Sequence, residues 1–308
     1  MVIFENVSKH YGVHKALDQV NFTVNKGKIL GLLGQNGAGK TTAMNIMTGC
    51  LAPSRGRVLM GGYDVLLQPG QAKQLIGYLP ETAPLYDEMT VEAYLRFACR
   101  LKSVEKAQVK KHIAQVAEKT GLQNVLERKI GNLSKGYRQR AGMAQALCGT
   151  PDVIILDEPT VGLDPRQASE MRQLILSLRG EHTVIFSSHI LSEVQSVCDR
   201  VLILHHGKVL CDSEMDSLKR GGNVLRAVIA GGEQTILPAL RSLQKVSRAE
   251  VIRGGEPGVT QVRLTVQEEG AERELFTLLS AMQAPLLRLQ PEENSLEEIF
   301  LQTTKEKQ

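Results

Sequence analysis

The hydrophobic positions near the N-terminus fall into short runs that are typical of strands. Residues 2–7 and 20–24 alternate between apolar and polar side chains, whereas residues 28–33 form an almost continuous apolar run. Alternation predicts a strand with one exposed face, and a continuous run predicts a strand that is buried on both faces. Residues 41–48 then have the pattern of a helix, and Gly49 follows as a helix stop.

Further along the chain, buried strands alternate with helices. An amphipathic helical stretch covers residues 90–120, with Thr90 as its start and Gly121 as its stop. Continuous apolar runs follow at residues 153–156 and 183–186. Strands that alternate with helices predict the α/β fold class, with a parallel sheet and helices on both of its faces.

The pattern changes at the charged, glycine-rich segment 219–222. Beyond it we expect the order β-α-β-β-α-β and a terminal helix, which is the order of a small α+β, ferredoxin-like unit. The chain is therefore predicted to have a main domain at residues 1–220 and an accessory domain at residues 223–308. In the accessory domain the expected strands are 224–230, 248–253, 260–267 and 285–289, and the expected helices are 235–244, 271–282 and 295–302.

The composition is that of a globular chain and argues against several classes of function. Of 308 residues, 42% are hydrophobic and 23% are charged, which excludes a disordered or fibrous protein. The net charge of +4 is too small to indicate nucleic-acid binding by itself, and the absence of Trp argues against a stacking platform for single strands. Five widely spaced cysteines without a C-x-x-C pair predict reduced thiols, not disulfides or a zinc site.

The N-terminal residues lack the basic stretch and the apolar core of a signal peptide. No window of 18 residues is both free of charges and predominantly apolar. We therefore expect that the chain does not span a membrane by itself, and that any role at a membrane comes through a partner.

The strongest chemical signal is the glycine-rich segment that follows the run at residues 28–33. Residues 34–41 fit the pattern G-x-x-x-x-G-K-[ST]. Its glycines let backbone N–H groups turn inward around phosphate oxygens, and the next helix adds the positive end of its dipole. Lys40 is expected to reach the β- and γ-phosphates, and the Thr41 hydroxyl to bind Mg²⁺. The nucleotide-binding residues predicted from this segment are Gly34, Gln35, Asn36, Gly37, Ala38, Gly39, Lys40, Thr41 and Thr42.

A second signal ends the apolar run at residues 153–156, where Asp157 and Glu158 follow in succession. Ligands bind at the carboxyl ends of parallel strands, so both carboxylates are expected beside the phosphate loop. We expect Asp157 to belong to the Mg²⁺ shell and Glu158 to polarise a water for attack on the γ-phosphate.

A third motif, Leu-Ser-Lys-Gly-Tyr-Arg-Gln-Arg, occupies residues 133–140. Ser134 and Gly136 open a predicted helix, which forms a second anion-binding helix start. With the phosphate loop and the acidic strand end in this order, residues 1–220 resemble the ATP-binding subunit of an ABC transporter. The resemblance implies a P-loop ABC ATPase domain with a mixed or parallel sheet core and a helical subdomain at about residues 82–150.

The resemblance also implies roles for four further residues. Tyr11 resembles the aromatic residue that stacks on adenine, and Asp164 lies in a Gly-Leu-Asp loop that signals across the dimer. Glu81 stands where the family usually has Gln, and His189 resembles the histidine that senses the γ-phosphate. The implied catalytic residues are thus Glu158, His189 and Glu81, and the implied Mg²⁺ ligands are Thr41, Asp157 and Glu81, partly through water. The remaining histidines, at positions 10, 14, 112, 182, 205 and 206, show no ligand spacing and are predicted to be structural.

In this family two ATP sites form between two subunits, so that Lys40 and Thr41 of one subunit face Ser134 and Gly136 of the other. The resemblance therefore implies that ATP and Mg²⁺ are bound, and that the chain forms a homodimer or pairs with a second ATPase subunit. It also implies separate integral membrane permease subunits as partners and a cytoplasmic position on the inner face of the cell membrane. No nucleic acid is expected as a partner.

Two departures from the family signature narrow the subclass. Lys135 replaces a Gly and Tyr137 replaces a Gln. With these two residues, Glu81 and the tail at residues 295–300, the chain resembles exporter-type ATPases. That subclass includes gliding-motility, antibiotic-resistance and copper-site maturation members. The resemblance therefore implies an ATPase that powers export, without fixing the substrate.

Three other functions are less consistent with the sequence. ABC ATPases that act on DNA or on the ribosome commonly have a long coiled coil or two ATPase domains, whereas this chain has a single phosphate loop and no sustained heptads. A nucleotide-binding regulator with the C-terminal domain as a ligand sensor is a second alternative, and the intact Glu158 argues against it. A GTPase would leave the signature at residues 133–140 unexplained.

Overall fold

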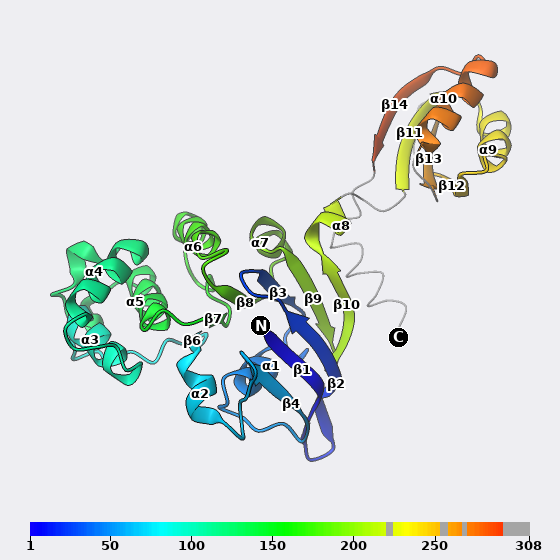
Figure 1. Cartoon of the computed structure of the whole chain (residues 1–308). Helices are drawn as coiled ribbons and strands as arrows, with labels where there is room; N and C mark the ends of the chain where they lie inside the picture. The colour runs from blue at the N-terminus through cyan, green and yellow to red at the C-terminus, as the bar shows by residue number, and fades with distance from the viewer. Residues whose placement is uncertain (220–223, 253–257, 267–269, 292–308) are drawn as a thin grey trace. The chain divides into compact units, whose positions relative to one another are not determined.

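The computed structural model describes residues 1–219, 224–252, 258–266 and 270–291 (Figure 1). The chain divides into two compact units, Met1–Glu214 and Met215–Gln308. This division lies close to the boundary expected near residue 220. The helix expected at residues 295–302 lies outside the described residues.

The first unit is built around a six-stranded sheet with the strand order β10-β9-β3-β8-β7-β6. Strands β9, β3, β8, β7 and β6 are parallel, and β10 pairs antiparallel with β9 at one edge. The predicted parallel sheet is therefore confirmed. Its strands are β3 (Ile29–Leu33), β6 (Ile76–Leu79), β7 (Val153–Leu156), β8 (Thr183–Ser188), β9 (Arg200–His205) and β10 (Lys208–Glu214).

A second, antiparallel sheet has the order β2-β1-β4-β5. Its strands are β1 (Val2–Tyr11), β2 (His14–Val24), β4 (Arg55–Met60) and β5 (Tyr63–Asp64). Helix α1 (Lys40–Met47) shares one hydrophobic core with both sheets, and the side chains of Met44, Ile46 and Met47 are completely buried. The apolar residues of α1 lie on one side of the helix and face this core. Gly49 follows α1 with a φ of 67°, as a helix stop requires.

The opposite face of the large sheet carries α6 (Pro165–Ser177) and α7 (Leu191–Val197) (Figure 1). Gly31 in the central strand β3 permits the close approach of α7. A Cβ atom on Gly31 would lie 2.5 Å from Cys198 Sγ and 2.7 Å from Val194 Cγ1. The large sheet therefore has helices on both faces, as the alternation of strands and helices predicted.

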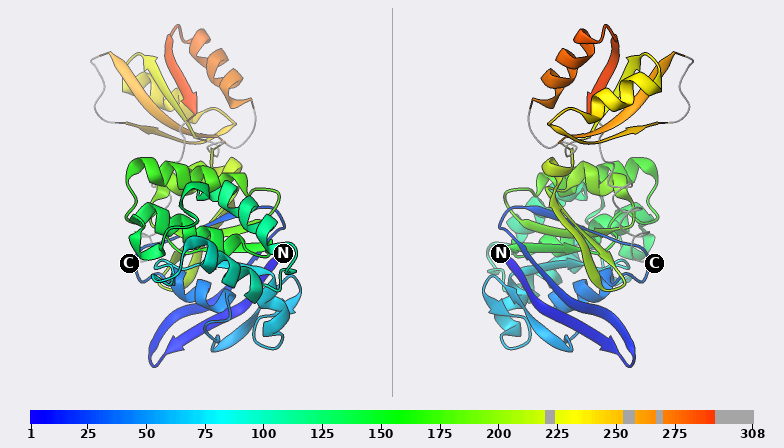
Figure 2. Two further views of the ribbon diagram at one scale, coloured as in Figure 1. Left: turned by 90° about the vertical axis from the view of Figure 1, so that its left-hand side faces the viewer. Right: turned by 90° about the vertical axis from the view of Figure 1, so that its right-hand side faces the viewer.

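A group of helices lies beside the sheet, away from the β1–β2 hairpin (Figures 1 and 2). It consists of α3 (Val91–Leu101), α4 (Val109–Thr120) and α5 (Lys135–Leu147), with short 3₁₀ turns at Gln123–Val125 and Ile130–Asn132. A short helix, α2 (Pro69–Gln74), precedes β6.

The single helix predicted over residues 90–120 is wrong, because the stretch forms the two helices α3 and α4. Ser103, directly after the end of α3, has a φ of 55°, which breaks the helical path. The ammonium of Lys102 donates hydrogen bonds to the carbonyl oxygens of Lys73 and Ile76 and ties this break to the sheet. The predicted start at Thr90 and stop at Gly121 are confirmed, since Thr90 caps α3 and Gly121 ends α4 in the left-handed conformation.

The second unit contains an antiparallel sheet with the order β12-β13-β11-β14. Alternate residues of β11 and β13 are buried, and α9 and α10 contribute to the same core, so both helices cover one face of this sheet (Figure 2). The element order β-α-β-β-α-β is as expected, and the assignment as a ferredoxin-like domain stays a prediction. The elements are α8 (Met215–Lys219), β11 (Val224–Ala230), α9 (Glu233–Arg241), β12 (Val246–Val251), β13 (Val259–Val266), α10 (Ala271–Ala281) and β14 (Leu286–Pro291).

None of the helices among the described residues combines the length and the apolar composition that a membrane crossing requires.

The contact between the helical group and the sheet provides a test of the fold. A Cβ atom on Gly77 of β6 would lie 1.9 Å from the carbonyl oxygen of Ala146 in α5. Because two backbones meet here, Gly77→Ala should lower the free energy of unfolding by about 1–3 kcal/mol. Chemical denaturation measures this change. Gly70→Ala is the matched control, since no atom lies within 4 Å of its added Cβ, and an equal loss in both variants would contradict the packing described.

Candidate active site

A cavity of about 560 Å³ opens at the carboxyl ends of the central parallel strands, where the phosphate loop meets the segments that follow β7 and β8. Four neighbouring strands position Lys40, His189, Glu158 and Glu81, because β3, β8, β7 and β6 are consecutive in the sheet. Most of the residues predicted to bind nucleotide lie in its wall. The lining consists of Tyr11, His14, Ala16, Gln35, Asn36, Gly37, Gly39, Lys40, Thr41, Thr42, Glu81, Glu158, Val161 and His189.

The phosphate loop is shaped by two glycines with positive φ, Gly37 at 81° and Gly39 at 108°. A Cβ atom on Gly39 would lie 2.5 Å from the carbonyl oxygen of Ala16, so the loop passes too close to β2 for any side chain. Gly39 is also the N-cap of α1, and no side chain caps this helix start. The first N–H groups of α1 therefore remain available to an anion, and the helix dipole favours negative charge at the same place.

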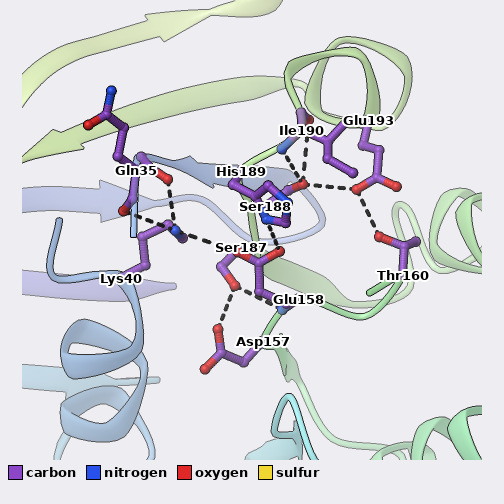
Figure 3. Close-up of polar contacts among 11 residues, drawn as sticks. Gln35, Lys40, Asp157, Glu158, Thr160, Ser187, Ser188, His189, Ile190 and Glu193 are labelled. Carbon is purple, nitrogen blue, oxygen red and sulfur yellow. Dashed lines mark hydrogen bonds and ion pairs between the residues drawn. The ribbon is translucent and has the colours of Figure 1, made fainter. Parts of the chain in front are cut away.

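The ammonium of Lys40 is buried at the centre of the site and only 6% exposed. It donates hydrogen bonds to the carbonyl oxygens of Gly34 at 2.7 Å and of Gln35 at 3.4 Å (Figure 3). Its distance to Glu158 Oε1 is 3.5 Å. A buried cation is expensive without such partners, so the loop carbonyls and Glu158 jointly stabilise this charge.

Glu158 is the most constrained acidic residue of the site. It follows β7 with a φ of 48°, which a residue with a side chain adopts rarely and at a cost of about 1–3 kcal/mol. Its backbone N–H donates to Ser187 Oγ at 2.9 Å, and its Oε2 lies 2.9 Å from His189 Nδ1 (Figure 3). Since an ionised carboxylate can only accept hydrogen bonds, Nδ1 of His189 carries the proton in this contact.

Asp157 lies below the cavity and is almost completely buried. Its Oδ1 accepts a hydrogen bond from Ser187 Oγ at 2.6 Å, which fixes the carboxylate between β7 and β8. Burial, with the charge of Asp157 as a second cause, raises the pKa of the Tyr78 hydroxyl to about 12. Tyr78 is therefore neutral at physiological pH and donates weakly to Asn45 of α1 at 3.5 Å.

The predicted metal ligands offer oxygen atoms only: the Thr41 hydroxyl and the carboxylates of Glu81 and Asp157. Thr41 and Glu81 are exposed on the cavity wall, whereas Asp157 lies deeper. Such a set of oxygen donors fits Mg²⁺, which binds oxygen and retains several waters in its shell.

The signature residues lie away from this cavity. Ser134 caps α5 by accepting a hydrogen bond from Tyr137 N at 3.5 Å, and Asp164 caps α6 by accepting one from Gln167 N at 2.8 Å. The two helix starts are adjacent, because a Cβ atom on Gly136 would lie 2.5 Å from Gln167 Oε1. Ser134 and Asp164 are thus exposed close to each other, Gly136 is buried against Gln167, and none of the three lines the cavity of the same chain.

Lys135 and Gly162 connect these two helix starts. A Cβ atom on Gly162 would lie 1.8 Å from Lys135 Nζ, so the ammonium rests directly against the glycine. Gly162 has a φ of 70° and tolerates this contact because it has no side chain. Gly162 thus leaves room for the side chain of Lys135, which stands where the family signature has Gly.

Two of the histidines predicted to be structural, His14 and His112, lie beside other potential ligand groups, and the structural role stays a prediction for both. His14 lines the cavity, on the hairpin that also carries Tyr11. His112, on α4, lies with Cys99 and Cys148, and one potential ligand atom of each falls within 4.8 Å of the others. The polar atoms of this group are already paired, because His112 Nε2 accepts from Gly149 N at 3.0 Å and the two Sγ atoms are 3.5 Å apart.

The chain was also compared with known proteins. The sequence profile described as ABC transporter matches residues 17–161. The linearmycin resistance ATP-binding protein LnrL of Bacillus subtilis is 31% identical over 99% of this chain and 98% of its own length. The chain belongs to the ABC transporter family. It is the ATP-binding and ATP-hydrolysing subunit, of the resistance and export type of these ATPases.

Two further comparisons cover the ABC ATPase unit. The ABC transporter ATP-binding protein NatA of B. subtilis is 40% identical over 67% of this chain and 85% of its own length. A solved structure of an ATP-binding subunit of an ABC transporter superimposes with a TM-score of 0.66 at 29% identity, over 71% of this chain and 92% of its own. The expected ABC ATPase fold is therefore confirmed for the first unit. The match to LnrL extends over both units of the chain.

The position of Lys40 leads to a binding prediction for this ABC ATPase. Charge-assisted hydrogen bonds contribute about 1.5–3 kcal/mol each, so Lys40→Ala should weaken ATP binding about 10- to 150-fold. Fluorescence titration with a nucleotide analogue measures the dissociation constant. Lys119→Ala, which removes an exposed lysine of α4, is the control and should bind normally. Unchanged affinity in Lys40→Ala would refute the phosphate-loop assignment.

Proposed function

We propose that the cavity is the ATP site of an exporter motor, and that two chains together clamp each ATP while docked on separate permease subunits. The observation that carries this proposal is the convergence of Lys40, Glu158 and His189 at one point of the sheet. A cation that can stabilise phosphate charge and a carboxylate that can orient water, with an imidazole holding the carboxylate, are suited to phosphoryl transfer to water.

In this proposal the residues of the phosphate loop hold the triphosphate of ATP. Backbone N–H groups from Gly34 to Thr41 and the positive end of the α1 dipole surround the phosphates, and Lys40 contacts the β- and γ-phosphates. Thr42 completes the wall on α1. Tyr11, which is half-exposed at the cavity rim, supplies a flat face for the adenine.

Thr41, Asp157 and Glu81 would hold Mg²⁺, in part through water. When bound, the ion neutralises charge on the phosphate oxygens. Glu81 differs from an uncharged glutamine in this position because its carboxylate adds a negative charge to the shell. Ser187 keeps Asp157 oriented toward this shell through the 2.6 Å hydrogen bond.

Glu158 acts as the general base of hydrolysis. Its carboxylate takes a proton from the attacking water, and His189 holds the carboxylate through the 2.9 Å contact with Oε2. Lys40, 3.5 Å from Oε1, contributes a positive charge where negative charge develops on the γ-phosphate. The strained backbone at Glu158 aims its side chain into the cavity and not along the strand axis.

The signature surface completes the site of a second chain. Ser134 and Gly136 begin α5, and Asp164 begins α6, so this surface presents two neighbouring helix starts and the cation of Lys135. Such a surface is complementary to a polyanion. Because these residues do not line the cavity of their own chain, a second copy or a paired ATPase must bring them to the ATP.

The helical group, at residues 82–150, carries the surface for the permease. Tyr86 and Phe97 are exposed there and form an aromatic pair with ring centroids 6.0 Å apart. Exposed aromatic residues are typical anchors of protein interfaces. Docking at this surface would hold the motor peripherally on the cytoplasmic face of the membrane.

The accessory unit, residues 223–308, serves regulation or dimer stability in this proposal. The similarity to LnrL, a resistance protein by its name, includes this unit and supports a role in exporting compounds to which cells are sensitive. The motif departures at Lys135, Tyr137 and Glu81 support the same subclass.

The assignment of the general base is tested by Glu158→Gln. The amide retains the shape of the side chain but cannot accept the proton, so ATP turnover should fall about 10²–10⁴-fold while ATP affinity is retained. Phosphate release measures the turnover. Glu170→Gln, a partly exposed carboxylate on α6, serves as the control. Unchanged turnover in Glu158→Gln would eliminate this assignment.

The adenine contact is tested by Tyr11→Ala. Loss of a base–aromatic stack costs about 1–3 kcal/mol, which predicts ATP binding that is about 5- to 150-fold weaker. Tyr11→Phe keeps the ring and should bind ATP normally. Isothermal titration compares both with Tyr63→Ala, whose ring lies on β5 outside the cavity, and equal affinity in all three variants would contradict the adenine contact.

A further inference from the structure

Glu193, in the first turn of α7, is a buried carboxylate that the proposed chemistry does not use. Only 5% of its surface is exposed. A carboxylate in such a position is unfavourable unless hydrogen bonds or a cation compensate for the lost water. Its partners therefore indicate what it does.

One oxygen of Glu193 receives two hydroxyl hydrogen bonds. Oε2 accepts from Thr160 Oγ1 at 2.8 Å and from Ser188 Oγ at 2.9 Å (Figure 3). Both hydroxyl groups belong to buried residues, at 6% and 1% exposure. The other oxygen, Oε1, lies 3.5 Å from Arg172 Nη1 of α6.

The two hydroxyl groups come from the segments that carry the general base and the histidine. Thr160 is two residues beyond Glu158, in the turn that follows β7, and Ser188 is the last residue of β8 and directly precedes His189. Glu193 thus bridges the turn after β7 and the end of the neighbouring strand β8. Its bridge lies beside the 2.9 Å contact between Glu158 and His189 (Figure 3).

The hydrogen bond between Ser188 and Glu193 fixes the residue that directly precedes His189. A serine hydroxyl has one proton, and the shorter of its two contacts is with Glu193 at 2.9 Å, whereas the carbonyl oxygen of Ile190 lies at 3.4 Å. The N–H of Ile190 donates to Ser188 Oγ at 2.9 Å, which closes the backbone around His189. Glu193 is thus the nearer acceptor for the Ser188 proton, and it favours the orientation in which Ser188 Oγ accepts from Ile190 N.

The adjacent serines of β8, Ser187 and Ser188, bind different carboxylates. Successive side chains of a strand point to opposite faces, so Ser187 reaches Asp157 while Ser188 reaches Glu193. Ser187 also accepts the N–H of Glu158 at 2.9 Å. The strained backbone of Glu158 is thus held on one side by Ser187 and, through Thr160, on the other side by Glu193.

We infer that Glu193 is a positioning residue for ATP hydrolysis, which keeps Glu158 and His189 in register by tying the turn after β7 to the end of β8. This inference rests on the proposed roles of Glu158 and His189. Glu193 does not line the ATP cavity and contacts no residue of the phosphate loop. Its loss should therefore affect the chemical step more than the binding of ATP.

The test compares the steady-state kinetics of Glu193→Ala, Glu193→Gln and Thr160→Val in the full chain. A displacement of about 1 Å at a reacting group lowers rates up to about 10²-fold, so kcat of Glu193→Ala should fall about 10- to 100-fold. KM for ATP should change less than about threefold. Glu193→Gln should recover most of the turnover, because its amide oxygen accepts the same two hydroxyl hydrogen bonds.

Thr160→Val removes one of the two donors without changing the shape of the side chain, and its kcat should fall less than that of Glu193→Ala. Glu181→Ala, which removes an exposed carboxylate, is the control and should match the parent chain. A kcat of Glu193→Ala within twofold of the parent would overturn the inference. An equal failure of Glu193→Gln would also overturn it, because the hydroxyl acceptor would then not be the relevant feature.

A double variant separates this inference from the proposed function. If Glu193 acts through Glu158, Glu193→Ala should lower the residual rate of Glu158→Gln by less than about threefold, since residues that act as a unit are not additive. A full multiplicative loss would overturn the positioning role. Full turnover in Glu158→Gln alone would instead refute the proposed general base, whatever Glu193→Ala does to the parent chain.

Discussion

The buried ammonium of Lys40 sets the requirement that the rest of the site meets. A cation at 6% exposure needs oxygen atoms around it, and the loop supplies them through the carbonyl groups of Gly34 and Gln35. Glu158 supplies the opposite charge at 3.5 Å. In the proposed function the γ-phosphate of ATP lies against Lys40 as well, so that Glu158, as the proposed general base, and the reacting phosphate share the same cation. The proposed geometry of hydrolysis therefore follows from how this one charge is stabilised.

The order of strands explains why three segments far apart in sequence serve this charge. Lys40 follows β3, Glu158 follows β7 and His189 follows β8, and these strands are consecutive in the sheet. Parallel strands deliver their carboxyl ends to one edge, so the three side chains meet without long loops. Strand order alone does not fix the segments that follow β7 and β8. Hydrogen bonds from Ser187 to Asp157 and from Ser188 to Glu193 hold these segments in place.

The sequence predicted those parts of the site that depend on local motifs. The phosphate loop, the acidic end of β7 and the helix start at Ser134 are short patterns with a direct physical reason, and the structure has each of them beside a strand or helix end as expected. The position of His14 on the cavity wall and the bridge from Glu193 to Thr160 depend on tertiary contacts between segments many residues apart. Their residue types are common on ordinary helices and hairpins, so no local pattern distinguishes them.

The contrast between local patterns and tertiary contacts also explains why the single helix predicted over residues 90–120 was wrong. At the break between α3 and α4, Ser103 has a φ of 55° and Lys102 contacts carbonyl groups near β6, neither of which periodicity over residues 90–120 reveals. The approach of His112 to two cysteines likewise depends on the packing of α3, α4 and α5. The buried runs at β3, β7 and β8, by contrast, could be predicted because a strand that is covered on both faces must be apolar throughout.

The separation of the signature surface from the cavity is the central feature of the account, because the proposed function requires that one chain holds only half of each ATP site. Light scattering of the Glu158→Gln protein with and without Mg-ATP tests this directly. The account predicts the 33.8 kDa mass of one chain without nucleotide and twice that mass with ATP. A mass that stays at 33.8 kDa at saturating ATP would contradict the account.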